Sequence, residues 1–151
     1  MAYATFAELA RAAEISGSLG SAALEREAEE SGVARATLLE RMDRELAVME
    51  EAIASGLGGS ERSRSGLTGG DAALIAVGPG VAGPLFRRVI AEAVAVGETN
   101  ARMGRVVAAP TAGASGIVPA VLLSLAHTRS LERSEIVSAL FAAGAVGAVI
   151  A

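Results

Sequence analysis

Two glycine-rich segments of the sequence also carry hydroxyl side chains, which gives them the composition of small-anion sites. The first is Ser65–Asp71 (SGLTGGD) and the second is Pro110–Gly116 (PTAGASG). Glycine allows backbone N–H groups to converge on a ligand, and a helix that begins after such a segment adds positive partial charge. Each segment therefore fits a small anion such as a substrate carboxylate, although a simple turn with a helix cap has the same composition.

Three polar residues precede the second segment on a mostly apolar stretch: Glu98, Asn100 and Arg105. Asn100 and Arg105 are candidates to point at a ligand. The alternative is an ordinary helix end with charge on its surface.

Several kinds of chemistry are excluded for this chain alone by the residues that it lacks. It has no cysteine, and all 13 of its basic residues are arginine. It therefore has no thiolate for a metal, no lysine for a pyridoxal phosphate Schiff base, and no P-loop lysine. His127 is the only histidine and is expected near a helix C-terminus rather than in a metal site. The net charge of −4 gives no indication of nucleic-acid binding.

A third glycine-rich stretch matches the sequence pattern of a dinucleotide-binding turn. Gly78–Gly83 reads GPGVAG, follows the apolar run Ala72–Val77 and precedes a predicted helix. Pro79 and Pro84 lie in the turn, and no second strand–helix unit with its acidic residue follows. We therefore do not interpret this stretch as a nucleotide site.

The elements that must position these segments are expected to be helices. Hydrophobic residues make up 52% of the 151 residues and aromatic residues only 3%, so the core consists mainly of small aliphatic side chains and favours an all-α fold. Capping signals predict helices from Thr5 to about Ser16 and from Ser21 to Ser31. The apolar stripe of a third helix, closed by Gly56, consists of Leu39, Met42, Leu46, Met49 and Ile53.

Further along the chain, a long loop at 58–70, expected to be functional, separates these helices from three more. Helices are predicted for about Leu85–Ala101, from about Ile117, and from about Ser134 to the end of the chain. The apolar run Ile136–Ala151 is short for a membrane span and is interpreted as a buried core helix. It ends without a cap, which suggests a truncated chain, and Met1–Ala10 lacks the features of a signal peptide.

Taken together, the candidate segments resemble the α chain of iron–sulfur-dependent L-serine dehydratases. The residues that carry the resemblance are SGLTGGD at 65–71, ETNARMGR at 98–105 and VVAAPTAG at 106–113, followed by SGIVP at 115–119. Their order and spacing match the family, and the stretch 110–119 is the most specific. The resemblance extends over nearly the whole chain, which we interpret as one helical domain, 1–151, forming the N-terminal half of the catalytic domain.

The resemblance implies an all-helical enzyme that converts L-serine to pyruvate and ammonia in the cytoplasm. A [4Fe–4S] cluster held by three cysteines acts as a Lewis acid on the serine hydroxyl, while an unidentified base removes the Cα proton. The residues expected to line the substrate pocket are Ser65, Thr68, Gly69 and Gly70. Those expected to face the cluster or the substrate carboxylate are Asn100, Thr111, Gly113 and Ser115.

Two departures from the family pattern concern the cluster. Ser115 occupies a position at which many members have a cysteine, and the Gly-Gly-Cys-type segment that follows in the family is absent. We therefore expect the cluster of the full-length enzyme to take its ligands from outside this chain, and the chain alone to bind no cluster and to be inactive.

A β-type chain or domain is an expected partner, whereas nucleic acid and membrane are not, and a homo-oligomer is left open. The alternatives are a non-catalytic helical partner subunit of the same fold and a related lyase for another β-substituted amino acid.

Overall fold

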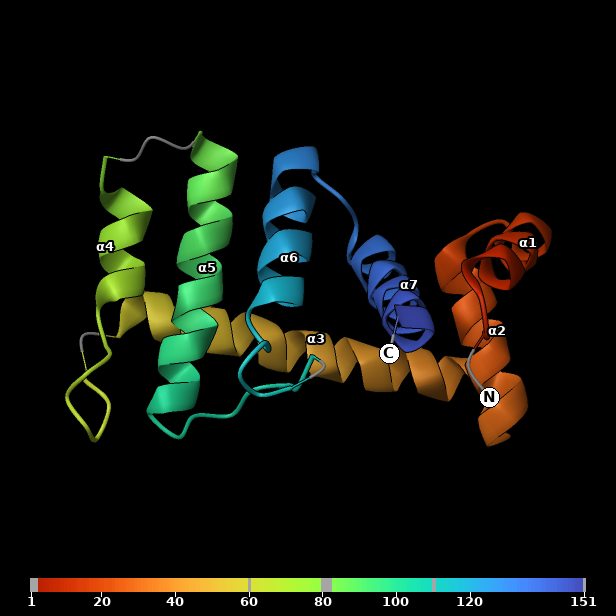
Figure 1. The fold of residues 1–151 in the computed structure, drawn as a ribbon, viewed down its shortest axis with the longest axis horizontal. Helices are drawn as coiled ribbons and strands as arrows, with labels where there is room; N and C mark the ends of the chain where they lie inside the picture. Colours follow the sequence, from red (N-terminus) through yellow and green to blue (C-terminus); the bar gives the residue numbers. More distant parts are fainter. Residues whose placement is uncertain (1–2, 60, 80–82, 110, 151) are drawn as a thin grey trace. The chain divides into compact units, whose positions relative to one another are not determined.

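The computed structural model describes residues 3–59, 61–79, 83–109 and 111–150, and within these ranges all regular structure is helical (Figure 1). The all-α prediction is therefore confirmed. The helices are α1 (Phe6–Ser16), α2 (Leu19–Ser31), α3 (Arg35–Gly58), α4 (Asp71–Val77), α5 (Pro84–Ala101), α6 (Ile117–Arg129) and α7 (Arg133–Ile150).

Local capping explains where the first two helices begin and end. The Thr5 hydroxyl accepts the Glu8 N–H at 3.2 Å, and Gly17, with φ of +83°, ends α1. Helix α2 begins at Leu19 rather than at the expected Ser21, because the cap is Ser18, whose hydroxyl accepts the Ser21 N–H at 3.0 Å. The helix therefore starts two residues earlier than predicted.

The chain divides into two compact units, one formed by residues 1–44 and 131–151 and the other by residues 45–130. In the first unit α2 packs against both α1 and α7. The contact with α7 is close: a Cβ added to Gly20 would lie 2.2 Å from the Ser138 hydroxyl oxygen. Leu9, Leu24 and Phe141 are among the buried side chains of this unit.

Helix α7 is long and apolar enough to cross a membrane by length and composition, with a mean hydropathy of 1.5 over 18 residues. This is weak evidence for a span, since core helices of soluble proteins have the same properties. Only 17% of the helix is buried, with Ile136 and Phe141 in its first half, while Gly147 and Ile150 are exposed. The expected core helix is thus buried in its first half only.

The second unit contains the C-terminal part of α3 together with α4, α5 and α6. Helix α5 packs against α4 on one side and α6 on the other. Ala52, Ile53 and Val96 form a buried cluster between α3 and α5. Of the predicted α3 stripe, Leu46, Met49 and Ile53 are buried and Met42 is partly buried, whereas Leu39 is 40% exposed; Leu38 is buried instead.

Gly56 does not close α3, which continues to Gly58. A Cβ at Gly56 would lie 2.1 Å from the Ala95 carbonyl oxygen, so this glycine allows the α3 and α5 backbones to touch. The prediction that Gly56 ends this helix is therefore wrong, because the role of this glycine is close packing.

The apolar run before the dinucleotide-like turn is helix α4, which the sequence analysis did not assign. A dinucleotide-binding unit requires a strand at this place, and the helix therefore supports the rejection of that interpretation. Part of the turn itself, Gly80–Ala82, lies outside the described residues.

Candidate substrate site

Both candidate loops lie at the same end of the second unit. Helices α4, α5 and α6 run in alternating directions, so the start of α4, the end of α5 and the start of α6 meet at one end (Figure 1). The first loop, residues 59–70, leads into α4, and the second, residues 102–116, connects α5 with α6. All eight predicted site residues therefore belong to this end of the unit.

Hydrogen bonds within the first loop fold it back on itself. The Ser63 N–H donates to the Thr68 carbonyl at 2.8 Å, and the Thr68 N–H donates to the Ser63 hydroxyl at 3.3 Å. Ser63 is 8% exposed, and its hydroxyl lies 3.1 Å from that of Ser65. Ser65 and Thr68 are both exposed residues, and the Ser65 hydroxyl also accepts the Leu67 N–H at 3.4 Å.

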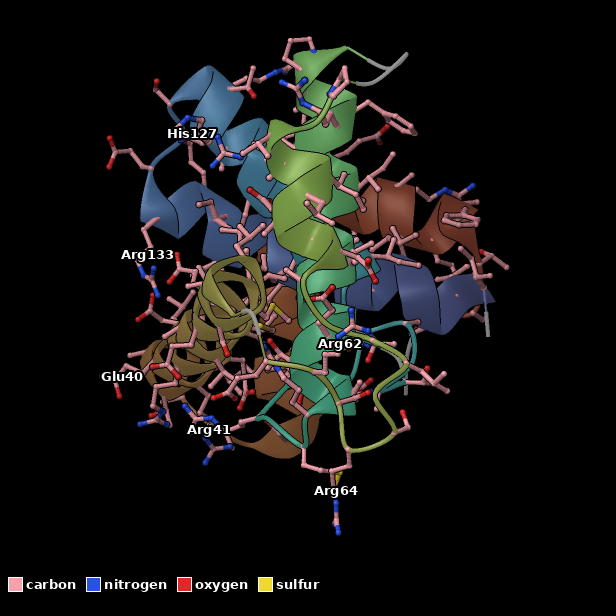
Figure 2. The ribbon with its side chains drawn as sticks, turned by 90° about the vertical axis from the view of Figure 1, so that its left-hand side faces the viewer. Glu40, Arg41, Arg62, Arg64, His127 and Arg133 are labelled. Atoms are coloured by element: carbon pink, nitrogen blue, oxygen red, sulfur yellow. The ribbon has the colours of Figure 1, made fainter. Side chains whose placement is uncertain are left out.

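Sequence reasoning did not single out Ser63. It was one serine among several in a loop, and its burial, which makes it the organising residue, depends on the folded loop. Figure 2 shows Arg64, the next residue, projecting away from the helices.

Gly69 and Gly70 have backbone conformations that favour glycine, with φ of +137° and +89°. A Cβ at Gly69 would also lie 2.5 Å from the Glu61 carbonyl oxygen. Gly69 is therefore fixed by close contact with the chain that enters the loop, whereas Gly70 provides the N-cap of α4.

Glu98 on α5 holds the start of α4. Its carboxylate accepts the N–H groups of Gly70 at 3.0 Å, Asp71 at 2.7 Å and Ala72 at 3.1 Å. The residue is 3% exposed. Convergent N–H groups at this segment were expected to receive a substrate anion; in the structure these three receive a carboxylate of the protein itself.

Two further side chains at the end of α5, those of Thr99 and the C-cap residue Arg102, bind main-chain carbonyls of other segments. Thr99 donates to the carbonyl of Ala52 at 2.8 Å. Arg102 donates to the carbonyls of Ser55 at 3.0 Å and Glu61 at 3.4 Å. These bonds tie the end of α5 to the C-terminal part of α3 and to Glu61 in the first loop. Ser55 is one of the last four residues of α3, whose carbonyls have no intrahelical donor.

Asn100 connects the same turn to the second loop. Its side-chain amide donates to the Ala112 carbonyl at 3.5 Å, the long limit of a hydrogen bond. Arg105, the other polar residue considered for a ligand, forms an exposed ion pair with Glu51 at 2.9 Å. The structure thus connects Asn100 to the second loop and engages Arg105 with α3.

The second loop is stabilised by its own hydroxyl groups. Ser115 is 2% exposed and donates to the Ala112 carbonyl at 2.6 Å, while the Thr111 hydroxyl accepts the Ala114 N–H at 3.2 Å. Thr111 and Gly113 are exposed. Pro110, at the start of the predicted segment, lies outside the described residues.

The residues of this chain do not fit the iron–sulfur cluster that the resemblance implies. The sequence contains no thiolate, and the hydroxyl at the expected ligand position, Ser115, is buried and already bound to a carbonyl. Within the described ranges no three His, Asp or Glu side chains are grouped as metal ligands. His127 lies exposed in the last turn of α6, as expected, and points outwards (Figure 2).

A cavity of about 470 Å³ lies beside the first loop, where Arg102 reaches α3. Its lining includes Ser55, Gly59, Glu61 and Thr99. None of the eight predicted site residues lines it, and Arg102 contributes its positive charge among carbonyl oxygens. This cavity is therefore adjacent to the candidate site and separate from it.

Comparison with known proteins identifies the family. The family model described as "Serine dehydratase alpha chain" matches residues 14–151, and the chain therefore belongs to the serine dehydratase α-chain family. The resemblance carried by the two loops and the stretch between them is confirmed.

Several curated proteins are similar to this chain. The probable L-serine dehydratase α chain of Bacillus subtilis is 42% identical over 118 residues, covering 76% of this chain and 39% of that protein. The L-serine dehydratase α chain of Peptoniphilus asaccharolyticus is 37% identical over 48% of this chain and 25% of its own length. L-serine dehydratase 1 of Escherichia coli is 53% identical over 38% of this chain and 13% of its own length.

The chain thus spans two fifths or less of the length of these relatives. No solved structure matches it.

Proposed function

We propose that this chain forms part of an L-serine dehydratase (L-serine ammonia-lyase), which eliminates water from L-serine. The Cα proton and the β-hydroxyl leave as water, and the resulting enamine tautomerises and is hydrolysed to pyruvate and ammonia. The observation that carries the proposal is that the two family-specific loops meet at one end of α4, α5 and α6. Names of relatives, including the B. subtilis protein, support the substrate.

Within this function the eight predicted residues form the substrate-binding surface. The hydroxyls of the exposed residues Ser65, Thr68 and Thr111 are suited to hydrogen bonds with the substrate. Gly69, Gly70 and Gly113 let a small amino acid approach the main chain closely. Asn100 and Ser115 support the second loop through the carbonyl of Ala112.

A [4Fe–4S] cluster in the full-length enzyme would require thiolates from outside these 151 residues. The chain has no lysine and thus provides no Schiff base for pyridoxal phosphate. Its own residues therefore act by binding and orienting the substrate.

The proposal extends to location and partners. We place the enzyme in the cytoplasm. A β-type chain or domain is its proposed partner, because the relatives from B. subtilis and P. asaccharolyticus are named as α chains. Neither nucleic acid nor membrane is included among the partners, and a homo-oligomer is compatible with the proposal.

The test is anaerobic conversion of L-serine to pyruvate by the complete native protein, after reconstitution with iron and sulfide. Thr68→Val and Thr111→Val should each raise KM about tenfold, the effect of losing a substrate hydrogen bond. Thr128→Val is the matched control, because its hydroxyl bonds to Ser124 at the opposite end of α6, and it should leave KM unchanged.

Absence of pyruvate from L-serine would contradict the proposal. Turnover of another β-substituted amino acid would then indicate the related lyase, and inactivity towards all of them would indicate the non-catalytic subunit. If Thr68→Val and Thr111→Val have the same KM as the control Thr128→Val, Thr68 and Thr111 do not bind the substrate.

A further inference from the structure

Helix α5 carries two buried carboxylates, and their partners differ in kind. Glu92, 5% exposed, binds Arg88 at 2.7 Å and the Ser124 hydroxyl at 2.8 Å. Glu98, 3% exposed, binds three main-chain N–H groups, and within the described ranges it forms no ion pair. Glu92 therefore joins α5 to α6, whereas Glu98 joins α5 to the N-terminus of α4, where the first loop ends.

Burial of a carboxylate is costly unless hydrogen bonds replace its hydration. For Glu98 the three N–H donors at residues 70–72 do so, and the N-terminal dipole of α4 adds favourable charge. The arrangement is reciprocal: these N–H groups stabilise the buried carboxylate, and the carboxylate holds the start of α4 against α5.

The part of the first loop that precedes Gly70 is held together by its own contacts. Gly69 lies against the Glu61 carbonyl, and Thr68 is bonded to Ser63 in both directions. Because the loop is internally fixed, anchoring it at Gly70 sets where the Thr68 hydroxyl, which belongs to the proposed substrate surface, lies relative to α5.

The same helical turn also contacts the second loop, two residues after Glu98. The Asn100 amide reaches the Ala112 carbonyl, which also accepts the Ser115 hydroxyl. Consequently one rigid turn of α5 holds both loops, and Glu98 provides the larger set of bonds.

We propose that Glu98 is a positioning residue of the substrate site, which fixes the first loop against α5 and thereby sets its distance from the second loop. The role rests on the proposed dehydratase function, because the loops matter to activity only if they bind the substrate. Glu98 itself is enclosed by α4 and does not touch the substrate.

The experiment compares Glu98→Gln with Glu92→Gln in the complete native protein. Both variants replace a buried carboxylate of α5 by an amide of the same shape, so a general loss of stability affects both. Glu98→Gln loses the negative charge and turns an N–H₂ group towards N–H donors. Glu98→Asp retains the charge at a shorter reach and tests rescue if the amide variant does not fold.

Hydrogen exchange of the segment 63–72 measures the loop directly. Because hydrogen bonds to charged groups are strong, exchange there should accelerate by about tenfold or more in Glu98→Gln, and less in Glu98→Asp. In Glu92→Gln the acceleration should appear in α6 around Ser124 instead. KM for L-serine should rise about tenfold in Glu98→Gln with a smaller change in kcat, and should be unchanged in Glu92→Gln.

Unchanged exchange in segment 63–72 of Glu98→Gln would overturn the proposal, and so would faster exchange with an unchanged KM. Equal KM increases in both variants would reduce Glu98 to a general structural role. If the unsubstituted protein does not convert L-serine, the dehydratase function fails, and the exchange comparison then decides by itself whether Glu98 holds the loop.

Discussion

At the scale of single residues, the candidate site is organised by side chains that bind the main chain of another segment. Glu98 and Thr99 in the last turn of α5 and Arg102, its C-cap residue, all do this. A bond of this kind fixes two backbones relative to each other, and its loss leaves a buried polar group without its partner.

Thr99→Val should destabilise the second unit by about 1 kcal/mol, because it removes the O–H donor to the Ala52 carbonyl while keeping the shape of the side chain. The midpoint of urea unfolding measures this change. Thr128→Val is the control: its hydroxyl bonds to Ser124, one turn earlier on the same helix, and its loss should change stability by less than about 0.5 kcal/mol. Equal shifts in the two variants would mean that the bond between helices contributes nothing beyond local packing.

At this scale the sequence predicted part of the candidate site. Hydroxyl groups beside glycines, such as Thr68 and Ser115, are visible in a sequence because turn chemistry is local. Ser63 and Glu98 were not predicted as organising residues, because their roles depend on burial and on partners as far as 28 residues away. An acidic residue within an apolar helical stretch was the only available signal for Glu98.

At the scale of helices, the close contact of α3 and α5 depends on a glycine. The Gly56 backbone lies against that of Ala95, so the space for a side chain is absent. Elsewhere on α5, Gly97 is exposed and has nothing within 4 Å of a Cβ placed there. The two glycines have the same intrinsic helix propensity, but Gly56 is packed against a neighbouring backbone and Gly97 is not.

Gly56→Ala and Gly97→Ala should therefore change stability in opposite directions. Gly56→Ala should lower the free energy of unfolding by about 2–3 kcal/mol, since two backbones must separate. Gly97→Ala should raise it by about 0.5–1 kcal/mol, because alanine loses less conformational entropy in a helix. Thermal unfolding followed by circular dichroism distinguishes these outcomes. Stabilisation by Gly56→Ala would show that α3 and α5 do not touch at this point in solution.

The helices themselves were largely predictable, and the exceptions have physical causes. Thr5 and Gly32 marked helix ends correctly because capping is a local interaction. Helix α4 was not assigned, because seven residues are too few to display a helical period. Its N-terminus is capped by Glu98, far along the chain, and the only local signal is the acidic Asp71 in its first turn.

At the scale of the whole molecule, α7 combines a buried first half with an exposed apolar second half. Gly144 and Ile150 are exposed, whereas Leu140 and Phe141 are buried. An exposed apolar helix face favours association with another apolar surface.

The 151-residue chain should consequently self-associate in solution. Sedimentation velocity should show species larger than a monomer, and the double variant Ala148→Glu, Ile150→Glu should shift the population towards monomer by charging the exposed half of α7. Ile15→Glu, at an 88% exposed position of α1, is the control for added charge and should leave the distribution unchanged. A monomer at all concentrations would contradict the expectation.

The iron content of the isolated chain follows from its donor atoms. A cubane cluster requires thiolate ligands, and this chain has none. After anaerobic reconstitution with iron and sulfide and removal of excess reagents, the chain should retain no stoichiometric iron, show no visible charge-transfer absorption and form no pyruvate from L-serine.

The variant Ser115→Cys makes the test more stringent, because it places one thiol at the position where many relatives of this family are expected to have a cluster ligand. One thiolate out of the three expected should still hold no stable cluster, so this variant should behave like the unsubstituted chain. Stoichiometric iron with a cluster spectrum in the unsubstituted chain would instead require oxygen or nitrogen ligands, and would overturn the view that the cluster depends on residues outside this chain.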